Sequence, residues 1–158
     1  MVSQHTKQEE MRKEIYELLI GRLQGVRSGA IKHIDLWNHN VEFIEQEDQW
    51  ERPAVFVEFH PLQWRRVKTG SDIVYTSHAR VSLHVVTDWH GSSSAVSSFR
   101  AESLSYFDLL DDIHSALRGM NGSHFNSFDL VESQTSHNHE ELLESIETYQ
   151  CVVSKSLR

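Results

Sequence analysis

Histidine is the side chain whose frequency first suggests chemistry. The chain has 158 residues, 11 of them histidines, and a neutral imidazole is a common zinc ligand. The densest group is His137-Asn138-His139 followed by Glu140, where two imidazoles and a carboxylate follow one another closely. That spacing alone does not define a zinc site, and the surrounding segment has the polarity of a loop. We therefore expect the histidines to be scattered and predict no metal site.

Two other pairs have residue types that could bind a metal ion, but one pair is too widely spaced and the other lacks a third ligand. His78 and His84 share a face of an expected strand, but six residues correspond to about 20 Å, too far for one ion. Asp108 and Asp112 are one helical turn apart, and such a pair could hold a divalent cation or share a proton. No third carboxylate accompanies them, so we expect two solvated side chains.

The sequence provides no recognisable nucleophile for catalysis. Cys151 is the single cysteine and is expected on the inward row of a strand, where a thiol is an inert small hydrophobe. The serines at 92–98 lack the Gly-x-Ser-x-Gly context of a nucleophile elbow, and no glycine-rich phosphate loop follows a strand. We predict that the protein is not an enzyme, with no catalytic residues, no cofactor and no metal.

Composition restricts the class of protein further. A length of 158 residues with 39% hydrophobic and 24% charged residues fits one globular domain, residues 1–158. A net charge of −8 argues against broad or specific nucleic-acid binding, which usually needs a basic face. The sequence has neither a signal-peptide pattern at its start nor a run long enough for a membrane span. We expect a protein made in the cytoplasm that does not enter a membrane.

The first half of the chain predicts one helix and two strands before a long third strand. Thr6 and Glu9 have the spacing of a capping box, and apolar residues then recur at helical spacing to Leu23. A short extended stretch is expected at 31–37. A strand is expected over 53–59, and another over 62–68 after Pro61, which should cause a bend.

Strict alternation predicts the longest strand. From Ile73 to Val85 every second residue is apolar or small, and the other face carries polar residues. About fourteen residues at about 3.3 Å each give roughly 45 Å, longer than a domain of this size needs. We expect the hairpin formed with 62–68 to project beyond the domain or to curl strongly around it.

The second half predicts a helix over 98–118 and two closing strands. Phe99, Tyr106, Leu110, Ile113 and Leu117 are expected on the buried face of that helix. Strands are expected near 125–131 and 147–157, separated by a polar loop over 134–140. The order α-β-β-β-α-β-β predicts an α+β fold with an antiparallel sheet, a long projecting hairpin and both helices on one face. The buried row of the last strand is expected to be Tyr149, Cys151 and Val153.

The surface patch whose residue types are most typical of an interface lies beside the hairpin turn. Tryptophan and arginine are enriched at interface hot spots, although basic residues also discourage edge-to-edge pairing and a tryptophan can fold under a sheet edge. The acidic stretch over 42–51 has the opposite charge, which would let copies of the chain meet head to tail. We predict an oligomer or partner interface at Trp64, Arg65, Arg66, Lys68 and Arg80.

The order of these elements resembles the tail-terminator, or tail-completion, proteins of long-tailed bacteriophages and their prophages. The resemblance covers about residues 8–157 and is one of pattern, without a single diagnostic motif. It consists of an N-terminal helix, the run Pro53 to Phe59, the hairpin through Ile73 to Val86, the helix Ala101 to Leu117 and two strands ending with Tyr149 to Val153.

The resemblance implies a non-enzymatic subunit of the virion tail or neck. Proteins of that family close into a ring, often a hexamer, which caps the tail tube and joins it to the head together with other tail and neck proteins. Two alternatives remain open. One is a small ligand-binding or regulatory α+β module, which an apolar pocket between sheet and helices would favour. The other is a hydrolase or metalloenzyme that uses some of the histidines and aspartates.

Overall fold

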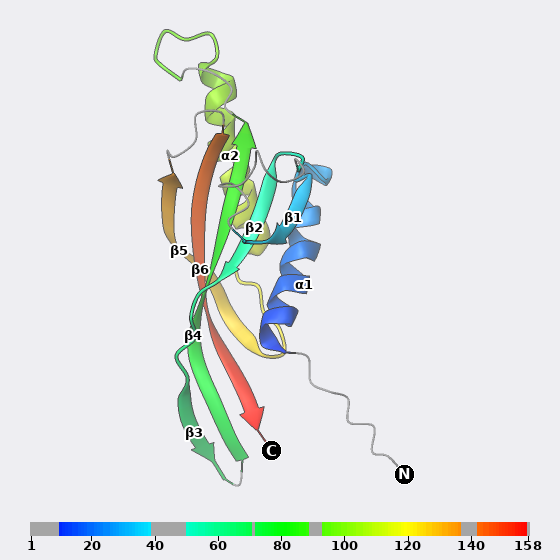
Figure 1. Cartoon of the computed structure of the whole chain (residues 1–158), viewed down its shortest axis with the longest axis vertical. Coiled ribbons are helices and arrows are strands. Elements are labelled where there is room, and N and C mark those ends of the chain that lie inside the picture. Colours follow the sequence, from blue (N-terminus) through cyan, green and yellow to red (C-terminus); the bar gives the residue numbers. More distant parts are fainter. Residues whose placement is uncertain (1–9, 39–49, 71, 89–92, 137–141, 158) are drawn as a thin grey trace.

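The computed structural model describes residues 10–38, 50–70, 72–88, 93–136 and 142–157. In this part the chain is an α+β domain with two α-helices and a mixed six-stranded sheet (Figure 1), so the predicted fold class is confirmed. The elements are α1 Met11–Gln24, the 3₁₀ helix η1 Val26–Ser28, β1 His33–Leu36, β2 Ala54–Phe59, β3 Arg65–Thr69, β4 Asp72–Asp88, α2 Arg100–Leu117, β5 Phe125–Ser136 and β6 Leu142–Leu157.

The strands follow the order β1-β2-β4-β6-β5, and β3 pairs with β4 on the same edge as β2. All neighbours are antiparallel except β1 and β2, which run parallel. The expectation of a purely antiparallel sheet was therefore wrong. A parallel pair needs a long crossover of about a dozen residues or more, and residues 37–53 between β1 and β2 provide it.

Strands β4 and β6 form the central pair of the sheet. They pair without interruption from Ile73–Leu157 to Asp88–Leu142. At about 3.3 Å per residue, the 17 residues of β4 extend roughly 55 Å. The lower part of this pair projects beyond both helices, with β3 at its side (Figure 1). We call this projection, formed by β3, residues 72–77 of β4 and residues 154–157 of β6, the arm. It confirms the expected projecting hairpin.

Pro61 separates two strands that lie in line along one edge of β4. Strand β2 ends at Phe59 and pairs with residues 81–86, whereas β3 begins at Arg65 and pairs with residues 72–76. Proline has no N–H to donate to a strand ladder, which explains the break at the expected bend. The break divides the edge into a part over the domain and a part along the arm.

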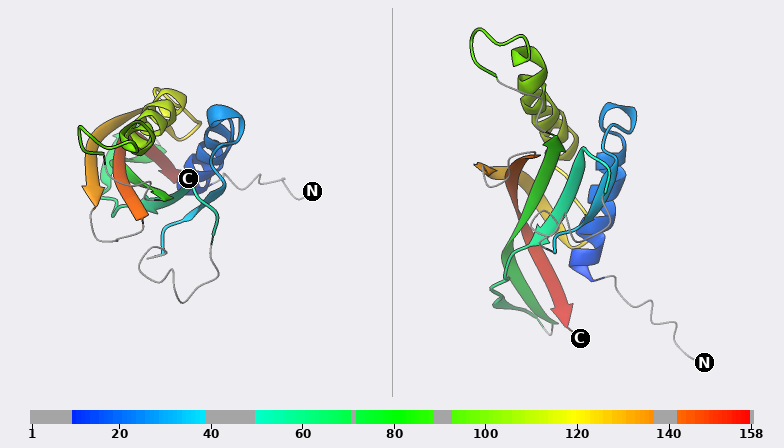
Figure 2. Two further views of the ribbon diagram at one scale, coloured as in Figure 1. Left: turned by 90° about the horizontal axis from the view of Figure 1, so that it is seen from above. Right: turned by 45° about the horizontal axis from the view of Figure 1, so that its top comes forward.

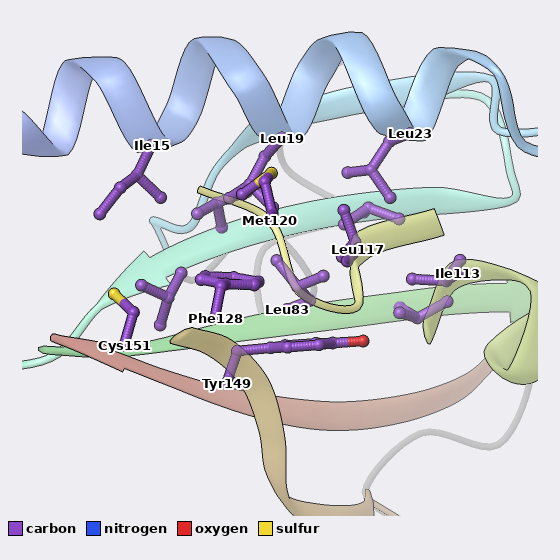
Figure 3. Close-up of a cluster of buried hydrophobic side chains, with 14 of the residues drawn as sticks. Ile15, Leu19, Leu23, Leu83, Ile113, Leu117, Met120, Phe128, Tyr149 and Cys151 are labelled. Carbon is purple, nitrogen blue, oxygen red and sulfur yellow. The ribbon is translucent and has the colours of Figure 1, made fainter. Parts of the chain in front are cut away.

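Both helices pack on one face of the sheet, which we call the inner face (Figure 2). Helix α1 buries Met11, Ile15, Leu19 and Leu23 at intervals of four residues. The expected row Tyr149, Cys151 and Val153 of β6 is buried in the same core, and Figure 3 shows Tyr149 and Cys151 on the side of this core opposite α1. Ile113 and Leu117 of α2 join this core, as expected. Phe99 was wrongly placed there: it precedes the first turn of α2 and is 52% exposed.

The strand boundaries in the last third differ from the prediction. Strand β6 begins at Leu142, five residues before the expected start at Glu147, and Gln134 belongs to β5 rather than to a polar loop. Glu144, Ser145 and Glu147 gave this segment the polarity of a loop, but pairing with β4 and β5 buries all three side chains. Tertiary pairing thus overrides local polarity.

The start of α1 is capped by a residue other than the expected pair. Glu10 precedes the helix, and its carboxylate accepts hydrogen bonds from the N–H groups of Arg12 and Lys13. Such a bond satisfies amides that have no partner inside the helix. The predicted capping residues Thr6 and Glu9 lie outside the described residues.

Glu14 of α1 fixes the connection between α2 and β5. Its carboxylate accepts hydrogen bonds from the N–H groups of Ser123 and His124, at 3.1 and 3.0 Å, and lies 3.3 Å from the His124 ring. Gly122 allows this close approach, because a Cβ atom there would collide with Glu14 and Phe125. Burial alone would raise the pKa of Glu14, but these hydrogen bonds outweigh it, so its pKa lies below the usual value.

We expect Glu14→Gln to lower the free energy of unfolding by about 1–2 kcal/mol at pH 7. Because the pKa of Glu14 is lower in the folded than in the unfolded chain, its stabilisation is complete above about pH 4.5 and is lost as the pH falls through the folded-state pKa. Urea unfolding of both proteins at pH 7 and at acidic pH measures the difference. Glu17→Gln, at an exposed position of the same helix, is the control. An equal loss in both variants would contradict this role for Glu14.

Candidate functional site

The predicted interface residues near the hairpin turn lie on the arm. Arg65, Arg66 and Lys68 are exposed residues of β3, and Trp64 precedes this strand with 39% of its surface exposed. None of the three cations forms an ion pair with another described residue. The ring of Trp64 and these three positive charges therefore face solvent at or beside the arm.

The strand register divides the predicted residues between the two faces of the sheet. Arg66 is opposite Tyr75 of β4, which is in turn opposite Lys155 of β6, and side chains directly opposite each other share a face. This row, together with Lys68, belongs to the inner face. Arg65 belongs to the outer face. Lys155 was missed because its neighbour across the sheet depends on a register that spans the whole chain.

Arg80 shares the outer face but lies away from the turn. Its guanidinium is 3.4 Å from Oε1 of Gln150, the residue opposite it on β6. Four positions separate Arg80 from Thr76, the partner of Arg65, or about 13 Å along the strand. The five predicted residues thus form no single cluster.

A second exposed surface lies on α2. Leu104 and Phe107 are 43% and 52% exposed, and Phe99 just before the helix adds another exposed ring. The side of α2 that enters the core carries Tyr106, Leu109, Ile113 and Leu117, and Phe107 is not part of it. Exposed aromatic and aliphatic groups gathered on one element are typical of interfaces.

A cavity opens beside this surface, between α2 and strands β5 and β6. Its volume is about 280 Å³. Glu147 lines it with only 7% of its surface exposed, and its Oε2 atom is buried with no hydrogen-bond partner, while Oε1 lies 3.4 Å from the Ser145 hydroxyl. The lining includes Phe107, Leu110, Asp111, His114, Glu147 and Tyr149.

The electrostatic character of this cavity is negative. Burial raises the pKa of Tyr149 strongly, and the charges of Glu147 and Asp129 raise it further. The Tyr149 hydroxyl lies 3.4 Å from Nδ1 of His114. Neither Glu147 nor Asp111 forms an ion pair with another described residue. A buried carboxylate oxygen without a partner is costly, and a cationic donor would satisfy it.

His84 is held between two carboxylates on the outer face. Its Nδ1 atom is 2.9 Å from Oε2 of Glu144, and its Nε2 atom is 2.7 Å from Oε1 of Glu58. Trp37 stacks on the imidazole with a centroid distance of 3.7 Å. Each ring nitrogen of His84 thus lies within hydrogen-bonding distance of a carboxylate oxygen. Sequence spacing could not reveal this arrangement, since its residues come from four separate segments.

We expect His84→Leu to lower the free energy of unfolding by about 3 kcal/mol, because it removes the hydrogen-bond partner of the buried Glu144 carboxylate. The double variant His84→Leu with Glu144→Leu should recover most of the loss. Chemical denaturation followed by tryptophan fluorescence measures both. A double variant as unstable as the single one would contradict this pairing.

Two other residues that the sequence raised as candidates for catalysis or metal binding lie in the core or in a surface ion pair. Cys151 is buried, and burial raises the pKa of its thiol to about 11. Asp112 forms an ion pair with Arg27. Within the described residues, no cluster of three or more histidine, cysteine, aspartate or glutamate side chains could hold a metal ion. Residues 137–140, with the paired histidines, and most of the acidic stretch over 42–51 lie outside the described part.

No helix in the described part combines the length and hydrophobicity needed to cross a membrane.

Comparison with known proteins finds similarity among solved structures but not among sequences. No protein-family model matches this sequence, and neither does any curated protein. Among solved structures, a chain from the virion of a native gene transfer agent particle is similar to this one, with a TM-score of 0.49 and 8% sequence identity. The alignment covers 89% of this chain and 95% of that chain.

Proposed function

We propose that this protein is a structural subunit of a bacteriophage or prophage virion that assembles with copies of itself. The observation that carries the proposal is the arm, which extends beyond both helices (Figure 1). Ordering a projecting segment costs conformational entropy, and in an isolated chain little burial compensates for that cost. Contact with another subunit would supply the missing burial.

The surface chemistry supports an assembly role as well. Trp64 and the basic residues of β3 occupy one end of the protein, and the exposed apolar groups on α2 occupy another region. Two different surfaces on one chain are the requirement for a head-to-tail contact, which closes into a ring when the rotation between neighbours is suitable. Basic residues on an edge strand also prevent unspecific strand pairing, a role compatible with a specific interface.

The finer proposal is a ring at the head–tail junction, like those of the tail-terminator proteins that the sequence resembles. Its partners would be other copies of the chain, with a hexamer as the expected ring, and the neighbouring tail and neck proteins. The protein would act without catalysis and would reside in the virion after its synthesis in the cytoplasm. No specific contact with nucleic acid or membrane is part of this role.

The alternative of a small ligand-binding module receives less support from the cavities. The cavity beside α2 has a volume of about 280 Å³, and a second one between η1, β4 and α2 has about 190 Å³. Ligand pockets usually have volumes of about 300–1,000 Å³ and a mostly apolar lining. The larger cavity is lined by the largely buried carboxylate of Glu147, which suits one cationic side chain better than a drug-sized ligand.

We expect the purified protein to convert from monomer to one discrete ring-sized species as its concentration rises. Light scattering behind a sizing column measures the mass over a range of concentration and salt. Trp64→Ser should weaken association at least tenfold, because exposed interface aromatics dominate binding energy. Because 61% of Trp64 is buried in the isolated chain (100 − 39), urea unfolding of the dilute monomer accompanies this measurement and separates a loss of stability from a loss of association.

Leu36→Ser provides the matched control for Trp64. Leu36 is 48% exposed on β1, away from the arm, and its replacement should leave association unchanged. A wild-type chain that stays monomeric up to its solubility limit would contradict the proposed self-assembly.

A further inference from the structure

We propose that the cavity beneath α2 is the receptor for the arm of a second copy of this chain, with Arg66 of one subunit paired to Glu147 of the next. This inference rests on the proposed assembly function and specifies its contact. The cavity and the inner face of the arm are complementary in charge, and each has a polar group that lacks a partner in the described part of the chain.

The receptor side is defined by a buried carboxylate. Glu147 is 93% buried (100 − 7), and its Oε2 atom has no hydrogen-bond partner. Asp111 adds a second carboxylate at the exposed flank of α2. A guanidinium can donate two parallel hydrogen bonds to one carboxylate, and charge-assisted bonds of this kind are the strongest that proteins form.

The donor side is defined by the register of the arm. Arg66, Tyr75 and Lys155 form a row across β3, β4 and β6 on the inner face, and Lys68 lies two residues beyond Arg66. Both lysines and Arg66 are exposed. One arginine would enter the cavity while the neighbouring cations remain near the acidic rim.

The two sides cannot meet within one chain. Glu147 is opposite Leu83 of β4, and Arg66 is opposite Tyr75. These positions on β4 are eight residues apart (83 − 75), or about 26 Å, farther than an arginine side chain extends. The contact therefore has to join different copies, and because its two sides differ, it can repeat from copy to copy.

Apolar groups accompany the charges on both sides. Phe107 lines the cavity and is half exposed, and Leu104 continues this surface along α2. Trp64 lies directly before β3 on the arm. An aromatic group packed beside the ion pair would exclude water, and exclusion of water strengthens the pairing.

The test measures association of the full chain by sedimentation velocity, with one charge changed at a time. Arg66→Glu and Glu147→Gln should each weaken association at least tenfold. The matched control for the arm is Arg65→Glu, the same change on the same strand but on the outer face. The control for the cavity is Glu132→Gln on β5, an exposed carboxylate outside the cavity. Both controls should change association less than threefold.

A mixture of the two variants tests the proposed contact more directly than either variant alone. The Arg66→Glu protein keeps its cavity intact, and the Glu147→Gln protein keeps its arm intact. An equimolar mixture should form a one-to-one dimer and nothing larger, because each dimer has only one intact contact. Circular dichroism establishes that both variants are folded. If Glu147→Gln does not fold, Asp111→Asn, at an exposed position, replaces it and should weaken association in the same direction.

The two proposals fail in different ways. If the wild type forms rings and Glu147→Gln forms them equally well, the cavity is not the receptor, while the assembly function stands. The same conclusion follows if Arg65→Glu disrupts association as strongly as Arg66→Glu. If the wild type remains monomeric at every concentration, both the contact and the proposed function are wrong.

Discussion

The uninterrupted pairing of β4 with β6 is the constraint on which the rest of the structure depends. Over the domain, these strands have β2 and β5 on their sides and both helices on one face. Over the arm, β3 is the one further strand of the described chain that pairs with them. A single register thus determines which residues enter the core and which project into solvent. A shift of one residue would exchange the two faces along the entire pair.

Because side chains alternate between the two faces of a strand, two buried glutamates of β6 lie on opposite sides of the sheet. Glu144 and Glu147 are three residues apart on β6 and therefore face opposite sides of the sheet. On the outer side Glu144 meets the imidazole of His84, so its charge has a partner within the chain. On the inner side the Oε2 atom of Glu147 has none. Glu144 thus has a hydrogen-bond partner within the chain, whereas one carboxylate oxygen of Glu147 has none among the described residues.

The sequence predicted those features that arise from local periodicity. Alternation from Ile73 to Val85 revealed the long strand and its projection, and four-residue spacing revealed the buried face of α1. The row around Cys151 was also evident. Local patterns could not reveal pairing between distant segments. The parallel β1–β2 contact, the early start of β6 at Leu142 and the row that joins Arg66 to Lys155 all depend on register across the whole chain.

The same limit explains why the candidate site was only half predicted. Trp64 and Arg66 stand out because tryptophan and arginine are enriched at interfaces, and they are neighbours in the sequence. Glu147 looks like an ordinary polar residue at the start of the expected last strand, and its significance comes only from burial beneath α2. A buried carboxylate without a partner raises the free energy of the isolated chain, and so does an ordered arm with little burial. One contact between neighbouring subunits would relieve both costs, which gives the two features a common physical explanation.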